Sequence, residues 1–292
     1  MTTEFNIPAE REGRAAPPDL AERREQMGTA IAAGAFATQH PVEEISFAGL
    51  RTLRFRPANA KPKGYMLQLH GGGFRIGRPE FEATLCERLA EQCQIEVIVP
   101  QYRLSPETPF PGGFNDALAA LNEFAAIAGD APLIVGGDSA GAGLAASLGV
   151  FCQADNTPRI DGLALLSPWL DLTVTAPSFD ANASDPMFST ESAQVAAELY
   201  LQGFDPLHPL ASPLFAEIET YPPTLISVGS GEVLLDDSLR FHEKLLQAGV
   251  ASELSRIDGM DHVAVVRGFD LPGSAETLDT LVSFIDRIIS KS

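Results

Sequence analysis

Apolar, strand-like runs alternate with amphipathic helix patterns from about residue 45 onward. The strand-like runs are Glu44–Ala48, Arg51–Arg56, Tyr65–His70, Glu96–Tyr102, Leu133–Gly137, Gly162–Ser167, Thr224–Val228 and Glu253–Ile257. The helix patterns are Glu80–Cys93, Phe114–Ile127, Ala140–Gln153, Asp237–Ala248 and Glu276–Ile289. Continuous apolar strands separated by helices predict an α/β fold with a mainly parallel, eight-stranded sheet covered on both faces. The first two strands meet at Gly49 and are expected to form an antiparallel hairpin at one edge.

Two segments do not follow this alternation. Residues 1–43 contain Arg- and Glu-rich, helix-like sequence at Leu20–Phe36. Residues 174–203 begin with Thr-Ala-Pro after Val174 and contain the helix-like Ser189–Leu201. In an open α/β sheet, ligands bind beyond the carboxyl ends of the strands, and insertions there cover the site. We therefore expect the two segments to form one composite cap.

Length and composition agree with this architecture. The chain has 292 residues, of which 45% are apolar and 20% charged, which is enough for one large domain with a sizeable core. We expect a single domain, residues 1–292, with its core at about 44–173 and 204–292 and its cap built from about 1–43 and 174–203.

Charge and cysteine content narrow the classes of partner. With 20 Lys and Arg against 39 Asp and Glu, the formal net charge is −19, which disfavours nucleic acid and anionic membrane surfaces as partners. The longest mainly apolar stretch, Ala140–Phe151, is too short and glycine-rich to span a bilayer, and Met1–Met27 shows no secretory signal. Cys86, Cys93 and Cys152 form no C-x-x-C pair, so we expect reduced cysteines and a cytoplasmic protein.

The pattern G-x-S-x-G occurs at residues 137–141, directly after a buried strand and directly before a small-residue helix. The five residues alone could be a chance glycine turn. Between a strand and a helix, they are typical of a nucleophile elbow, in which the serine backbone is strained and small neighbours allow close packing. The context therefore predicts that Ser139 Oγ is a nucleophile at the carboxyl edge of the sheet.

A serine hydroxyl needs a base to accept its proton, and five histidines are available. His262 lies in a turn just after the last predicted strand, and hence at the same sheet edge as Ser139. His40 precedes a proline in the N-terminal region, His208 stands between a leucine and a proline, and His242 belongs to a charged helix. We predict that His262 is the base.

The base needs an acid that holds its tautomer and stabilises the imidazolium. Glu232 falls immediately beyond the strand Thr224–Val228. Asp236 and Asp237 fall where the next helix begins, where capping and the helix dipole account for acidic residues. Position favours Glu232, with Asp236 as the alternative, and the order Ser…Glu…His is that of the α/β-hydrolases.

Three glycines follow His70 at the end of another predicted strand. Their unhindered backbone N–H groups, together with that of Ala140, could bind the oxyanion that develops during acyl transfer. A flexible loop or a phosphate cradle would also use glycines, but the G-K-[ST] ending of a phosphate loop is missing. We expect His70 to be a structural, hydrogen-bonding residue.

Taken together, these motifs resemble the hormone-sensitive-lipase-like branch of the α/β-hydrolases, the bacterial family IV esterases, over roughly residues 45–290. The segments that carry the resemblance are His70–Phe74, Tyr102–Pro111, Asp116, Gly137–Gly141 and Leu166–Asp171.

The resemblance implies a role for each matching residue. Gly72, Gly73 and Ala140 would be the oxyanion donors, and Ser139 and His262 the nucleophile and base. The usual acid of the family is an aspartate that begins a D-x-L-x-D-[DE] pattern, whereas this chain has Glu-Val-Leu-Leu-Asp-Asp at residues 232–237. The family also implies a cap formed by N-terminal helices and a mid-chain insertion, and two copies that could pair as a homodimer through an edge strand or the terminal helix.

We predict a cofactor-independent carboxylic ester hydrolase that acts on short-to-medium acyl esters through a Ser-His-Glu/Asp triad and an acyl-enzyme. No metal site is expected, because the triad and helix caps account for the His, Asp and Glu residues. An amidase, lactonase or deacetylase with the same triad would be an alternative, as would a non-catalytic ligand-binding relative.

Overall fold

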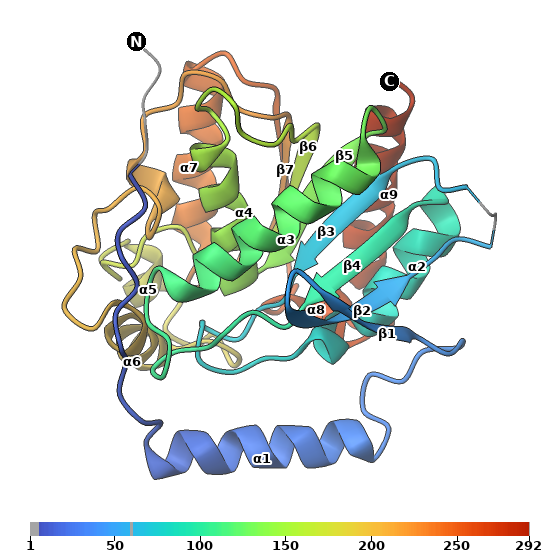
Figure 1. Cartoon of the computed structure of the whole chain (residues 1–292). Helices are drawn as coiled ribbons and strands as arrows, with labels where there is room; N and C mark the ends of the chain where they lie inside the picture. Colours follow the sequence, from blue (N-terminus) through green and yellow to red (C-terminus); the bar gives the residue numbers. More distant parts are fainter. Residues whose placement is uncertain (1–5, 59–60, 292) are drawn as a thin grey trace.

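The computed structural model describes residues 6–58 and 61–291 (Figure 1). Eight strands form one sheet in the order β1-β2-β4-β3-β5-β6-β7-β8. The strands are β1 (Glu43–Phe47), β2 (Leu50–Phe55), β3 (Tyr65–Leu69), β4 (Glu96–Pro100), β5 (Leu133–Asp138), β6 (Gly162–Leu166), β7 (Thr224–Gly229) and β8 (Ser252–Ile257). The helices are α1 (Pro18–Ala32), α2 (Ala83–Cys93), α3 (Gly112–Ala128), α4 (Ala140–Phe151), α5 (Ser178–Ala181), α6 (Thr190–Leu201), α7 (Leu235–Gln247), α8 (Ala264–Arg267) and α9 (Ser274–Ile289), with 3₁₀ turns η1 (Pro79–Glu82) and η2 (Pro213–Phe215).

The sheet has the predicted mixture of strand directions. β1 and β2 form an antiparallel hairpin, β2 runs antiparallel to β4, and the remaining neighbours are parallel. The central strand β5 lies between β3 and β6, with Gly137 paired to Leu69 on one side and to Leu165 on the other. The chain that leaves β5 therefore emerges in the middle of the carboxyl edge.

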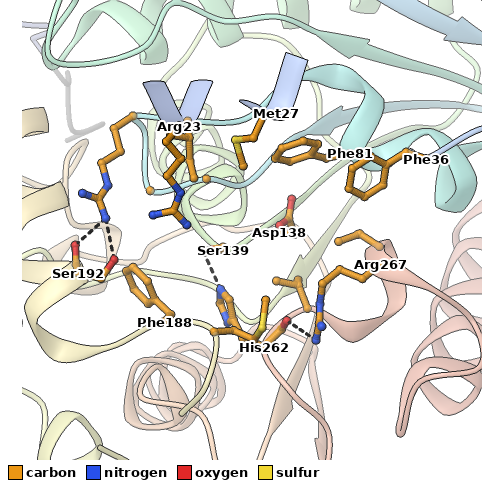
Figure 2. Close-up of a pocket in the computed structure, with 17 residues that line it drawn as sticks. Arg23, Met27, Phe36, Phe81, Asp138, Ser139, Phe188, Ser192, His262 and Arg267 are labelled. Carbon is orange, nitrogen blue, oxygen red and sulfur yellow. Dashed lines mark hydrogen bonds between the residues drawn. The ribbon is translucent and has the colours of Figure 1, made fainter. Parts of the chain in front are cut away.

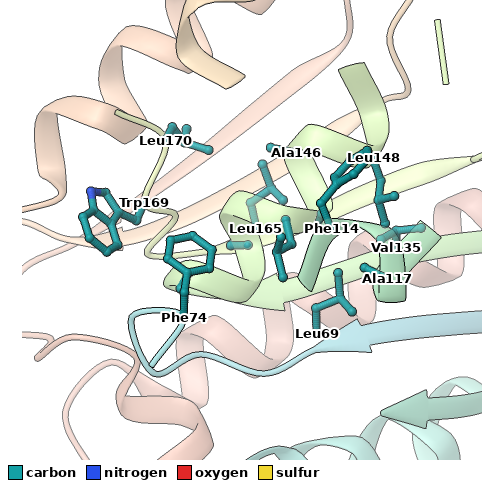
Figure 3. Close-up of a cluster of buried hydrophobic side chains, with 14 of the residues drawn as sticks. Leu69, Phe74, Phe114, Ala117, Val135, Ala146, Leu148, Leu165, Trp169 and Leu170 are labelled. Carbon is teal, nitrogen blue, oxygen red and sulfur yellow. The ribbon is translucent and has the colours of Figure 1, made fainter. Parts of the chain in front are cut away.

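Helices cover both faces of the sheet and enclose two large apolar cores among the described residues. Adjacent β5 residues divide between them: Val135 belongs to the core under α3, α4 and α7, and Ile134 to the core under α2 and α9. This division follows from the alternation of side chains along a strand. Figure 3 shows the first core, where Leu69 and Val135 of the strands face Phe114 of α3. Burying each such side chain stabilises the fold by roughly 1.5–3 kcal/mol.

Element boundaries differ from the prediction by a few residues, for local reasons. The predicted helix over 80–93 begins as the 3₁₀ turn η1 at Pro79 and becomes α-helical at Ala83. β4 ends at Pro100 and not at Tyr102, and the Gln101 N–H still donates to the Arg51 carbonyl of β2 at 2.8 Å. Cys86 and Cys93 of α2 are buried in the second core, whereas Cys152 is only partly buried.

The helices of the two segments outside the alternation, α1, α5 and α6, lie beyond the carboxyl ends of the strands (Figure 1). In α1, only Leu20 is buried. Arg24 attaches α1 to the body of the fold by donating to the carbonyls of Arg75 (2.8 Å) and Ser105 (2.6 Å). α6 packs its Tyr200 ring against the Phe74 ring at a centroid distance of 3.9 Å. None of the described helices has the length and apolarity that crossing a membrane requires.

Candidate active site

Ser139 occupies a strained turn between β5 and α4. Its φ and ψ are 52° and −118°, a region that residues with a side chain rarely adopt. The flanking glycines permit the turn, because a Cβ on Gly141 would lie 2.0 Å from the Leu69 carbonyl oxygen and one on Gly137 would lie 2.5 Å from the Gly141 carbonyl group. The strained elbow expected from the sequence is therefore present.

Ser139, His262 and Glu232 form a continuous hydrogen-bonded chain. Ser139 Oγ lies 3.0 Å from His262 Nε2, and His262 Nδ1 lies 2.6 Å from Glu232 Oε2. The three side chains come from the loops that follow β5, β8 and β7, so the parallel strands bring them to one edge. All three residues are buried.

The Glu232 carboxylate has its other oxygen fully engaged. Oε1 accepts hydrogen bonds from the Gly229 N–H at 2.6 Å and from the Ser167 hydroxyl at 2.8 Å. From the sequence, no role was assigned to Ser167, which directly follows β6 and lies within the Leu166–Asp171 motif. The two donors fix the carboxylate so that Oε2 is directed at the imidazole.

The environment of His262 suits a general base. Burial lowers its pKa, but the charge of Glu232 and the hydrogen bond to it outweigh burial, and the pKa is raised above the ordinary 6.5. Donation from Nδ1 to Glu232 leaves the Nε2 lone pair free to accept the Ser139 hydroxyl proton. The Phe188 ring stacks on the imidazole at a centroid distance of 5.7 Å.

Asp236 and Asp237 do not cap their helix, so that part of the sequence interpretation is wrong. No side chain caps the start of α7. Asp236 Oδ2 accepts the Ser178 N–H at 2.8 Å, and Asp237 Oδ2 accepts the N–H groups of Leu170 (2.8 Å) and Asp171 (2.9 Å). Burial raises the Asp237 pKa to about 7. The two carboxyl groups tie α7 to the loop after β6 and to α5, and it is Glu232 that hydrogen-bonds His262.

The three-glycine loop forms a tight turn beside Ser139. Gly72 and Gly73 have φ of 115° and 60°, and a Cβ on Gly72 would lie 2.1 Å from the Ile76 carbonyl oxygen. The Gly72 carbonyl accepts the N–H of Ile76 at 2.9 Å, which closes the turn. Ala140 is the first residue of α4, so its N–H has no acceptor within the helix.

His70 supports this loop and does not contact Ser139. Its Nδ1 donates to the Gly71 carbonyl at 2.9 Å, and its ring stacks on Tyr102 at 4.2 Å between centroids. Burial lowers the pKa of His70 to about 4, so the ring is neutral at pH 7. The structure agrees with the structural role expected for this residue.

A buried pair of carboxyl groups lies beneath the elbow, and sequence reasoning missed it. Glu82 of η1 hydrogen-bonds Asp138, and Gln68 Nε2 donates to Glu82 Oε2 at 2.8 Å. Burial and the charge of Asp138 raise the Glu82 pKa well above its usual range, and burial also raises the Asp138 pKa. Asp138 also accepts the N–H of Gly71, which connects the elbow to the glycine loop. The only sequence signal was an acidic residue within G-x-S-x-G.

Ser139 and His262 open into a cavity of about 240 Å³ (Figure 2). Gly72 and Gly73 also line it. The rest of its wall is mostly apolar and aromatic, with three arginines, and comprises Arg23, Met27, Phe36, Arg75, Ile76, Phe81, Asp138, Met187, Phe188, Ser192, Val263, Val266 and Arg267.

Among the described residues, one group of side chains has the spacing of metal ligands, although the sequence predicted none. His40 Nδ1 lies 3.2 Å from Glu87 Oε1 and 3.3 Å from Glu91 Oε1, on the outer face of α2. Glu87 also accepts the N–H groups of Gln39 and His40, so these contacts hold the chain after α1 against α2. Spacing could not reveal the group, because His40 is distant from Glu87 in sequence.

Comparisons with known proteins agree with the fold. A family model described as the alpha/beta hydrolase fold matches residues 66–266. An esterase of Acinetobacter venetianus is 37% identical over 223 residues, which cover 75% of this chain and 73% of the relative. An acetyl-hydrolase of Streptomyces hygroscopicus is 37% identical over 202 residues, which cover 68% of this chain and 67% of the relative.

Solved structures give the same result. The crystal structure of an esterase from the bacterial hormone-sensitive lipase family superposes with a TM-score of 0.86 at 32% identity, covering 94% of this chain and 93% of that one. The chain therefore belongs to the alpha/beta-hydrolase family, in the branch of the bacterial hormone-sensitive lipase esterases.

Proposed function

We propose that this protein is a carboxylesterase that hydrolyses small carboxylic esters through Ser139, His262 and Glu232. The observation that carries the proposal is the hydrogen-bonded chain from Ser139 Oγ through the imidazole to Glu232, with distances of 3.0 and 2.6 Å, at the floor of a cavity. The relatives described as esterases and acetyl-hydrolases support the same reaction class.

Acylation begins when Ser139 Oγ attacks the ester carbonyl carbon while His262 Nε2 accepts the hydroxyl proton. Glu232 accepts a hydrogen bond from Nδ1 throughout, and its charge stabilises the imidazolium. The carbonyl oxygen becomes an oxyanion that the N–H groups of residues 72, 73 and 140 bind. Each such donor is worth about 2.7–4 kcal/mol of transition-state stabilisation.

The tetrahedral intermediate then collapses to an acyl-enzyme. The bond to the alcohol oxygen breaks, and the alcohol leaves with the proton that His262 holds. In the second half, His262 removes a proton from water, and the resulting hydroxide attacks the acyl carbon. The second tetrahedral intermediate releases the carboxylic acid, and the proton returns from His262 to Ser139.

The cavity wall supports a preference for short-to-medium acyl groups. A volume of about 240 Å³ accommodates a small ester, and the lining side chains are mainly apolar. Met27 and Phe36 reach it from the N-terminal segment, and Met187 and Phe188 from the mid-chain segment. We propose on this basis that residues 1–43 and 174–203 together act as the cap.

A chain-length series of 4-nitrophenyl esters tests the proposal. We expect the purified protein to release nitrophenol fastest from the shorter acyl chains, and Ser139→Ala to lose the activity. The proposal fails if no ester is hydrolysed, or if Ser139→Ala is as fast as wild type. Faster cleavage of the matched nitroanilides than of the esters would assign the triad to an amidase instead.

A further inference from the structure

Three arginines surround the cavity in a protein that is strongly acidic overall. Arg23 comes from α1, Arg75 from the chain just after the glycine loop, and Arg267 from α8. The whole chain has only 20 Lys and Arg against 39 Asp and Glu. Three guanidinium groups around one small pocket therefore oppose the average charge of the molecule, and they form a local positive field beside Ser139.

Arg75 is partly buried, and two neutral oxygens contact one nitrogen of its guanidinium. Its Nη2 donates to the Ser192 hydroxyl at 2.6 Å and to the Ser192 carbonyl at 3.2 Å (Figure 2). Burial lowers the Arg75 pKa, and the nearby charge of Arg23 lowers it further, against the opposing effect of Asp19. Arg75 thus carries a positive charge close to another cation.

Arg23 extends from α1 into the cavity, toward Ser139 and His262 (Figure 2). Within residues 6–58 and 61–291, no carboxylate forms an ion pair with it. The next residue differs, because Arg24 pairs with Glu107 at 2.6 Å and donates to two backbone carbonyls. Arg24 thus holds α1 in place, while the Arg23 guanidinium remains available to a ligand.

Arg267, on the opposite wall, is only partly engaged. Its guanidinium lies 3.6 Å from the Asp261 carboxylate, and its Nη2 donates to the His262 carbonyl at 3.4 Å. Its Nε is buried and has no hydrogen-bond partner within the described part of the chain. Asp138 is the acidic residue of the cavity wall; it accepts the N–H of Gly71, burial raises its pKa, and its Oδ1 has no hydrogen-bond partner within the described residues.

We propose that the cavity selects small esters that carry a second, ionised carboxylate group, which binds Arg23 and Arg75. This inference rests on the proposed esterase function and adds its substrate class. Two neighbouring guanidinium groups repel each other, and a bound carboxylate relieves that repulsion and accepts charge-assisted hydrogen bonds. Arg75 is partly buried beside mostly apolar cavity walls, which strengthens its attraction for the carboxylate relative to bulk water, whereas Arg23 approaches from the exposed helix α1.

Two matched pairs of substrates test the selectivity. Mono-(4-nitrophenyl) glutarate and its neutral analogue 4-nitrophenyl glutaramate place the carboxylate or an amide of similar size on the acyl side. The pair 4-acetoxybenzoate and 4-acetoxybenzamide does the same on the alcohol side. We expect kcat/KM of the anion to exceed that of the amide about tenfold or more in at least one pair, because hydrogen bonds between charged groups discriminate on this scale.

Variants then assign the preference to the arginines. Arg23→Gln and Arg75→Gln should each bring the ratio of anion to amide toward one, and high salt should do the same in the wild type. Arg287→Gln is the matched control, because it removes one positive charge from α9, where Arg287 forms an exposed ion pair with Glu253 of β8. Its ratio should equal that of the wild type.

The outcomes separate the two proposals. If the wild type hydrolyses none of the four esters, the esterase function itself fails. If it hydrolyses them but prefers the amide, or shows no preference, in both pairs, the carboxylate selectivity is refuted and the esterase function stands. The selectivity is also refuted if the preference for the anion survives unchanged in Arg23→Gln and Arg75→Gln.

Discussion

Replacing Glu232 with glutamine tests how the triad acid works. Gly229 N–H and the Ser167 hydroxyl both donate to Oε1, so the amide oxygen of glutamine should take that position. The amide NH₂ then takes the place of Oε2, which lies 2.6 Å from His262 Nδ1. Two donors cannot face each other, and the imidazole must move its proton to Nε2. That tautomer cannot accept the Ser139 proton.

The size of the effect follows from this change of tautomer. Locking a catalytic histidine in the wrong tautomer lowers kcat by about 10⁴ in a serine-triad protease. At about 1.36 kcal/mol per factor of ten, this corresponds to about 5 kcal/mol of lost transition-state stabilisation. Asp236→Asn changes only the contact with Ser178 and a charge in the first turn of α7, worth about 0.3–1 kcal/mol of stability.

The two variants are compared by the kcat for steady-state hydrolysis of a short 4-nitrophenyl ester, and circular dichroism confirms that each variant is folded. We expect Glu232→Gln to lose about four orders of magnitude in kcat and Asp236→Asn to stay within a few-fold of wild type. The reasoning is refuted if the folded Glu232→Gln protein keeps more than a tenth of the activity. A loss in Asp236→Asn larger than in Glu232→Gln would make Asp236 the functional acid.

Three further predictions concern pH, the glycine loop and a buried carboxyl group. Because the His262 pKa is raised and the base acts in its neutral form, kcat/KM should rise with pH through a midpoint above 6.5. A pH–rate profile with a lower midpoint would contradict this prediction. Gly72→Ala should impair activity far more than Gly73→Ala. The new Cβ would lie 2.1 Å from the Ile76 carbonyl oxygen in Gly72→Ala, but no closer than 3.4 Å to any described heavy atom outside residues 72–74 in Gly73→Ala. Equal kcat/KM values for the two variants would count against the loop geometry. Asp237 has a folded-state pKa of about 7 against an ordinary 3.8, so the folded protein binds an additional proton between these pH values and its free energy of unfolding falls as pH rises. In urea unfolding, Asp237→Asn should therefore gain stability relative to wild type from pH 4 to 7. A difference in unfolding free energy that stays constant over this range would refute the prediction.

The sequence predicted the parts of the site that depend on local pattern. The elbow at Ser139 follows from five consecutive residues and their flanking elements. His262 and Glu232 follow from their positions just beyond strands, because parallel strands bring their carboxyl ends to one edge. Glu232 lies close to the end of β7, whereas Asp236 is already within α7.

Contacts between distant segments could not be predicted from one chain. Asp237 lies in the first turn of α7, yet its side chain accepts hydrogen bonds from the backbone after β6, whose position cannot be predicted from the sequence. Glu82 reads as part of a helix face, and only the folded chain brings it against Asp138. Arg23 has the pattern of an exposed helical residue, and its direction into the cavity depends on how Arg24 anchors α1.

Covalent labelling tests the central claim, that the Ser139 hydroxyl is the nucleophile, most directly. A fluorophosphonate should add once per chain, and peptide mapping by mass spectrometry should place the adduct on Ser139, with loss of ester hydrolysis in proportion to labelling. Ser139→Ala should remain unlabelled. An active protein that forms no adduct, or that carries it on another residue, would contradict the account.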